Sequence, residues 1–74
     1  MSAEKIIRMA NQIATFMLSR PHDDGVQGCA QHINDFWEPR MRTQLFAVID
    51  AGGHGLLPLV MEAAPQIRRP VPTG

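Results

Sequence analysis

Cys29, His32 and His22 are the residues whose types and spacing come closest to a chemical site. Cys29 and His32 lie three residues apart, so they share one face of a helix, and His22 precedes them. A structural zinc site needs four ligands, usually in two pairs, and no second pair is present. A Cys29–His32 nucleophile beside Asp35 is the catalytic alternative, but Cys29 falls in an apolar stripe, as a small core residue does. We therefore predict no metal-binding and no catalytic residue in this chain.

The Gly-Gly-His-Gly run at 52–55 is the second candidate for chemistry. A phosphate-binding loop needs a lysine after its glycines and a strand before them, and this run has neither. His54 is therefore expected to be a loop residue rather than a general base. Four short helices also leave no obvious pocket of the ~300–1,000 Å³ that small substrates usually occupy. The sequence predicts neither an enzyme nor a cofactor site.

Composition limits the class of protein further. Seventy-four residues form one domain, and seven basic and seven acidic side chains leave no field that attracts nucleic acid. One cysteine cannot form an intramolecular disulfide, and the sequence shows neither the apolar core of a signal peptide nor a membrane-spanning run. We therefore expect a cytoplasmic protein with no nucleic-acid or membrane partner. An apolar content of 45% with five methionines favours a compact domain with an apolar surface suited to binding other proteins.

Proline and glycine stops divide the chain into helices. Ser2 is suited to cap the first helix, and Pro21 biases the residue before it away from helical geometry. The polar run 22–24 supplies the next cap, and Pro39 suits the first turn of the third helix. The predicted fold is all-α, a small bundle of three main helices plus a short fourth with an extended C-terminal tail. We expect helices near 3–20, 24–37, 39–51 and 57–64, a single helical domain over 1–67, and an extended or disordered tail over 68–74.

The first predicted helix carries more apolar surface than its neighbours can cover. Its apolar residues spread over about 200° of the circumference, whereas a surface helix needs little over 100°. Polar residues, Asn11 among them, occupy the rest of the circumference. Either a partner protein covers the surplus, or this helix is the central one of the bundle. The apolar set is Ile6, Ile7, Met9, Ala10, Ile13, Ala14, Phe16, Met17 and Leu18; Ile7, Phe16 and Leu18 are predicted for the partner interface, and Ile13, Met17, Ile33 and Leu45 for the core.

The stretch HINDFWEPRMRTQL, residues 32–45, combines aromatic residues, a proline and two arginines. Arginine beside tryptophan, phenylalanine and methionine is the composition of protein interface hot spots. We predict a helix–turn–helix corner in which Trp37 closes the core while Phe36, Arg40 and Arg42 dock onto a larger partner. The Arg42 guanidinium is expected to pair with a carboxylate, either on the preceding Glu38 or on the partner. The alternative is that both arginines are simply solvated.

Nucleic acid is the weaker interpretation of the arginines. Arg68 and Arg69 would join the two arginines of the corner, and a helix that begins at Pro39 would offer its N-terminus to a phosphate. Four arginines on a neutral chain nevertheless neutralise few phosphates. A free-standing regulatory or nucleic-acid-binding helical module therefore stays as the competing class.

Four blocks of the sequence resemble the delta subunit of NAD-dependent formate dehydrogenase. They are MANQIATFM at 9–17, HINDFWEPRMR at 32–42, the L-x-x-x-x-D-A-G-G run at 45–53 and IRRP at 67–70. The blocks follow one another over nearly the whole chain, and H-I-x-x-F-W-x-P-R-M-R is the most specific of them.

This resemblance implies a small accessory subunit of a cytoplasmic complex that oxidises formate to carbon dioxide and reduces NAD. In such a complex the large alpha subunit holds a molybdenum- or tungsten-bound pterin and iron–sulfur clusters. Beta and gamma subunits carry FMN and further clusters. The resemblance implies no catalytic residue and no cofactor in the delta chain itself, which is expected to dock on the alpha subunit. Both a permanent subunit and a transient factor that aids cofactor insertion agree with it.

Overall fold

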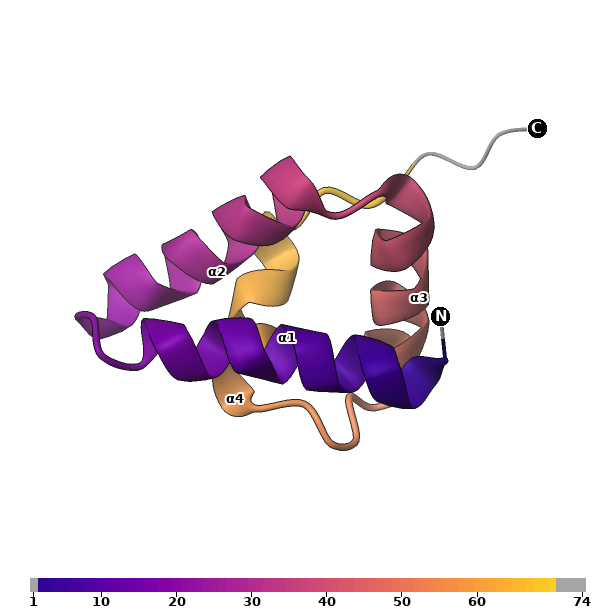
Figure 1. The fold of residues 1–74 in the computed structure, drawn as a ribbon, viewed down its shortest axis with the longest axis horizontal. Coiled ribbons are helices and arrows are strands. Elements are labelled where there is room, and N and C mark those ends of the chain that lie inside the picture. The colour runs from indigo at the N-terminus through magenta and orange to yellow at the C-terminus, as the bar shows by residue number, and fades with distance from the viewer. Residues whose placement is uncertain (1, 71–74) are drawn as a thin grey trace.

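The computed structural model of this chain describes residues 2–70. Within that range it contains no strand, and the helices are α1 (Ala3–Met17), α2 (His22–Phe36), α3 (Pro39–Asp50), α4 (Pro58–Ala63) and a short 3-10 helix, η1 (Ala64–Gln66). Figure 1 shows α1 and α2 joined by a tight turn at one end of the long axis, with α3 at the other end and α4 between them. The predicted all-α fold of three main helices and a short fourth is confirmed.

Local signals account for where the helices begin and end. The Ser2 hydroxyl accepts a hydrogen bond from the Lys5 amide at 3.2 Å, so Ser2 caps α1 as predicted. At the other end of α1 the Arg20 amide donates to the Met17 carbonyl at 3.0 Å, and the helix stops at Met17 instead of near Arg20. The polar cap predicted for α2 is wrong, because α2 begins at His22 behind Pro21 with no side-chain cap.

Glycines end α3 and shape the loop that follows. Gly52 and Gly53 have φ angles of +116° and +71°, which side chains with a Cβ rarely adopt. The Gly53 amide donates to the Val48 carbonyl at 2.9 Å and so satisfies one of the last carbonyls of α3. The Gly-Gly-His-Gly run is therefore a helix stop, as its composition predicts.

One apolar core lies between the helices. α1 contributes Ile6 and two alanines that bring its backbone close to its neighbours, and the largest fully buried side chains of the other helices are Ile33, Leu45 and Val60. Trp37 joins them with 6% of its surface exposed. The remaining residues predicted for the core, Ile13 and Met17, are half-buried and pack against its edge. The core draws on every α-helix, so no single helix is stable without the others.

α1 and α2 approach each other most closely near the turn that joins them. Gly25 is buried, and a Cβ placed on it would lie 2.7 Å from the main-chain oxygen of Met17. A Cβ on Gly28 would instead meet the Met17 sulfur at 3.0 Å. The first contact is with rigid backbone and the second with the far end of a flexible side chain.

Candidate partner-docking surfaces

The structure separates the residues that could have formed a metal site or a nucleophile. Cys29 is fully buried, whereas His32 is exposed, and its ring stacks against Phe36 with the ring centroids 4.8 Å apart. His22 Nε2 lies 3.0 Å from an Oε1 atom of Glu62 on α4. Within residues 2–70, no group of three or more histidine, cysteine, aspartate or glutamate residues could hold a metal ion.

The Cys29 thiol is expected to be unreactive because it is buried. Desolvation raises the pKa of its thiol from the ordinary 9.0 to about 11. The thiolate is the nucleophilic form of cysteine, so the folded chain holds very little of it at neutral pH. The arrangement gives Cys29 the role of a small core residue.

Alkylation of Cys29 tests this assignment. At pH 8 we expect iodoacetamide to react about a hundredfold more slowly with the native chain than with the chain in urea, because the raised pKa removes most of the thiolate. Equal alkylation rates in the native chain and in urea would contradict the assignment.

The raised pKa of Cys29 also makes the stability of the fold depend on pH. The folded state holds the proton more tightly, so this contribution is complete below pH 9 and is lost as pH rises toward about 11. A fall in the free energy of unfolding between pH 9 and pH 11, measured by urea titration, checks this expectation.

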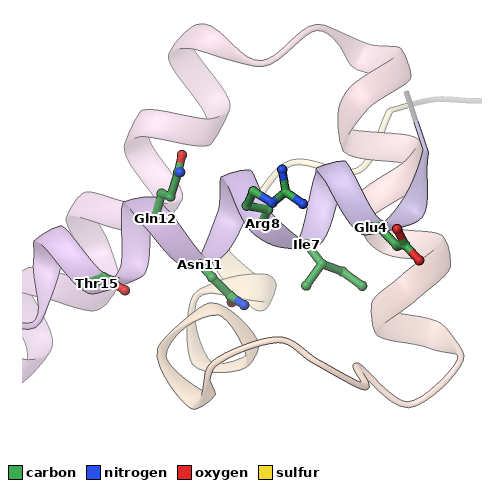
Figure 2. Close-up of a pocket in the computed structure, with 6 residues that line it drawn as sticks. All are labelled: Glu4, Ile7, Arg8, Asn11, Gln12 and Thr15. Atoms are coloured by element: carbon green, nitrogen blue, oxygen red, sulfur yellow. The ribbon is translucent and has the colours of Figure 1, made fainter.

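The expectation that no substrate-sized hollow exists is wrong, since the surface carries several. One of about 510 Å³ runs along α1, and Figure 2 shows that all six side chains lining it come from that one helix. A second of about 430 Å³ lies between α1 and α3, with Ile7 and Val48 in its wall and His54 at its edge. Neither brings together a nucleophile, a base and an oxyanion donor, so both are surface grooves rather than candidate active sites.

Asn11 has a structural role that the sequence analysis missed. Its Nδ2 donates to the Gly55 carbonyl at 2.8 Å, and its Oδ1 accepts from the Leu57 amide at 2.9 Å. The loop that follows α3, residues 51–57, which we call the glycine loop, therefore packs over the polar side of α1. The signal that could have shown this is the position of Asn11 in the middle of a helix, where asparagine is unfavourable unless its side chain has a partner.

The exposed apolar surface of α1 is smaller than its helical wheel predicts, and it is concentrated at one end. Phe16 and Leu18, beside the turn into α2, are each 63% exposed. The Arg20 guanidinium lies 5.7 Å from the centroid of the Phe16 ring. Ile7, also predicted for the interface, is half-buried, and a Cβ placed on Gly55 would lie 3.5 Å from its Cγ2 atom, so the glycine loop passes near it. We call Phe16, Leu18 and Arg20 the turn patch.

The second exposed apolar surface lies at the corner between α2 and α3. Phe36 is 73% exposed although the adjacent Trp37 is buried. Arg40 is exposed in the first turn of α3. We call Phe36 and Arg40, with the His32 ring that contacts Phe36 at a tilt of 37°, the corner patch.

Arg42 does not join the corner patch. Its Nη1 donates to the main-chain carbonyl of Arg68 at 2.6 Å, so the predicted pairing with a carboxylate is not what the described residues show. Its Nε is buried and makes no hydrogen bond within residues 2–70. Arg42 thus binds the C-terminal part of its own chain, and its predicted place in a partner interface rests on the sequence alone.

Arg69 is also used within the chain. Its guanidinium makes two hydrogen bonds to Asp50, at 3.1 and 2.7 Å, and lies 4.1 Å from the centroid of the Phe46 ring. The hydrogen bond from Arg69 lowers the pKa of the Asp50 carboxyl. Residues 68 and 69, at the start of the predicted tail, are therefore tied to α3, while residues 71–74 lie outside the described part of the chain.

The predicted interface residues do not form one surface. The turn patch lies where α1 joins α2, and the corner patch lies where α2 approaches α3, near the opposite end of a molecule 39 Å long (Figure 1). Among the described residues, no helix has the length and apolar character needed to cross a bilayer.

The fold and these surfaces define a small all-α protein whose exposed aromatic side chains, rather than an enclosed pocket, are its most distinctive features. A family model described as the NADH-dependent formate dehydrogenase delta subunit, FdsD, matches residues 5–64. The match covers most of the chain, and the protein belongs to this family. No curated protein and no solved structure matches the chain.

Proposed function

We propose that this chain is a non-catalytic accessory subunit of a cytoplasmic formate dehydrogenase complex and that it docks on the large alpha subunit through the corner patch. Membership of the delta-subunit family supports a place in a multi-subunit enzyme. In the proposed complex, formate and NAD are converted to carbon dioxide and NADH by the alpha, beta and gamma subunits. The delta chain would stabilise the alpha subunit or help to assemble it.

The exposure of Phe36 is the observation that carries the docking surface. A small core gains from every large side chain that it encloses, yet this ring is left 73% exposed beside a tryptophan that is buried. Burying such a ring against a partner contributes ~1.5–3 kcal/mol. Arg40 follows four residues later and is exposed, and an arginine guanidinium can bind a carboxylate through two parallel hydrogen bonds. An aromatic anchor beside an arginine is the usual composition of a hot spot.

The redox groups of such a complex are assigned to the other subunits. Iron–sulfur clusters are held by several cysteine thiolates, and the one cysteine of this chain is buried with its pKa raised. The described residues therefore do not fit an iron–sulfur cluster. The grooves along α1 and between α1 and α3 are open to solvent and do not enclose a molybdenum or tungsten pterin or FMN.

Docking is tested by pull-down with a tagged alpha subunit and purified delta-chain variants. Phe36→Ala and Arg40→Ala should each weaken binding by about tenfold or more, because hot-spot truncations exceed 1–2 kcal/mol. The far-ultraviolet circular dichroism of both free variants should match the parent, since both side chains are exposed. Arg42→Ala is a less suitable variant, because it also removes the hydrogen bond to Arg68.

The matched control is Phe16→Ala, which removes the same side chain from the turn patch. It should bind the alpha subunit like the parent. If Phe16→Ala weakens binding and Phe36→Ala does not, the turn patch is the docking surface and the proposed orientation is wrong. Parent-like binding by every variant would remove both patches as the site of docking.

A permanent subunit is distinguished from an assembly factor by its amount in the finished enzyme. We expect the delta chain to remain in a one-to-one ratio with the alpha subunit in complex that already holds its metal. Quantitative mass spectrometry of enzyme purified through the alpha subunit measures this ratio. A chain found only with the metal-free alpha subunit would be a transient factor.

A further inference from the structure

Residues 66–69, near the C-terminus, are bound by side chains of α2 and α3 that make hydrogen bonds to the backbone of the segment. We call this segment the strap. Asn34 Nδ2 donates to the Gln66 carbonyl at 3.0 Å, and Asn34 Oδ1 accepts from the Arg68 amide at 2.8 Å. One side-chain amide therefore satisfies two main-chain groups on either side of Ile67, as a neighbouring peptide unit would. Between these two bonds, Ile67 is only 4% exposed and belongs to the core.

The other half of the strap is bound by α3. Arg42 donates to the Arg68 carbonyl, and Arg69 reaches both Asp50 and the ring of Phe46. Asn34 lies on α2, whereas these partners lie on α3, so the strap bridges the two helices that form the corner. Figure 1 shows the segment after η1 running beside the connection between α2 and α3. The strap also lies beyond residues 5–64, the part of the chain that the family model matches.

The two halves of the strap differ in how easily they can be released. The inner half is anchored by a buried isoleucine and by the Asn34 amide. The outer half is held by the Arg42 hydrogen bond to the Arg68 carbonyl and by the side chain of Arg69, whose ion pair with Asp50 is exposed, with 56% of the Asp50 and 59% of the Arg69 side chain accessible. Salt screens exposed ion pairs, whereas it has little effect on buried apolar contacts. The outer half is therefore the part that opens first.

We propose that the strap is a releasable clamp that fixes α2 against α3 and thereby holds the corner patch in the shape that docks. The coupling to docking rests on the proposed function, but the clamp itself does not. Phe36 lies within one helical turn of Asn34, and Arg40 lies within one turn of Arg42. Each docking residue is thus two positions from a residue that binds the strap, so the two share a backbone segment although their side chains lie on different sides of the helix. When the strap opens, α2 and α3 lose their bridge, and the docking residues lose the preorganisation that binding requires.

Trp37 provides a reporter for strap opening in the full-length free chain. It is the only tryptophan, it is buried at the corner, and it follows Asn34 by less than one helical turn. In Asn34→Ala and Arg69→Ala we expect acrylamide to quench its fluorescence about threefold more effectively, with helical content unchanged, because local opening exposes the corner. Raising the salt concentration should increase quenching in the parent but hardly at all in Arg69→Ala. Arg8→Ala, which removes an exposed arginine from α1, should behave like the parent.

Pull-down of the alpha subunit with the same variants tests the coupling. Arg69→Ala should bind at least about threefold more weakly than the parent, while Arg8→Ala should not. Parent-like quenching in both strap variants overturns the clamp and leaves the docking proposal intact. Increased quenching with parent-like docking overturns the coupling. If Phe36→Ala docks normally, the proposed docking surface fails, and quenching alone still decides whether the strap is a clamp. Should Asn34→Ala unfold, Arg69→Ala decides, because its side chain is exposed.

Discussion

Trp37→Ala should leave most of the free chain unfolded at 25 °C. The tryptophan is 6% exposed within a core that all four α-helices share, and removing so large a buried side chain destabilises a fold by ~3–5 kcal/mol. A single core in a chain of this length rarely supplies more than ~3–5 kcal/mol. Urea titration followed by far-ultraviolet circular dichroism, with thermal melting beside it, measures the loss.

The adjacent aromatic residue provides the control for this prediction. Phe36→Ala removes a ring that is 73% exposed, so its free energy of unfolding should stay within ~0.5 kcal/mol of the parent. Two neighbouring residues would then have opposite effects, with Trp37 required for folding and Phe36 required for docking. A Trp37→Ala chain that melts like the parent would show that the corner is not part of the core.

Gly25→Ala should destabilise the chain by ~1–3 kcal/mol, as overpacking a close contact does. The new Cβ would lie 2.7 Å from the Met17 carbonyl oxygen, and backbone cannot move aside as a side chain can. In an exposed helix the same substitution stabilises by ~1 kcal/mol, because alanine is the better helix former. At Gly25 the clash should outweigh this gain, so the net effect on the free energy of unfolding is destabilising. Thermal melting and urea titration of the full chain check the prediction.

Gly28→Ala, one turn further along α2, is the matched control. Its Cβ would meet the sulfur of Met17 at 3.0 Å, and that side chain can rotate away. We expect a stability equal to or slightly above that of the parent, because the gain in helix propensity offsets the small rearrangement. If Gly25→Ala were as stable as Gly28→Ala, the close approach of α1 and α2 near their turn would not be part of the native packing.

The number and order of the helices follow from the sequence because their signals are local. Ser2, Pro39 and the glycines after Asp50 act on residues within one helical turn, so their effect does not depend on the rest of the chain. The apolar stripe of α2 also follows from spacing within a single helix. Cys29 and Ile33 are both buried, as their spacing predicts.

The sequence could not show which apolar residues of α1 remain exposed. Its wheel gives the width of the apolar arc, but the neighbours that cover the arc come from distant parts of the chain. α1 packs against α2, α3 and α4, and Ile6 is buried and Ile13 half-buried, while Phe16 beside the turn stays 63% exposed. The middle of the helix agrees with the interpretation of α1 as the central helix, and cover by a partner stays a prediction for its C-terminal end. Its middle is central to the bundle, and its C-terminal end presents an uncovered apolar surface.

The long-range polar contacts were decided by tertiary structure alone. Asn11 pairs with residues 44 and 46 positions away, and Asn34 with residues 32 and 34 positions away. Arg42 was expected to seek a carboxylate but binds a main-chain carbonyl 26 positions away. Side-chain type shows only that each group needs a partner. Which main-chain atom becomes that partner depends on where packing of the apolar core places the glycine loop and the strap, and helical periodicity carries no information about that placement.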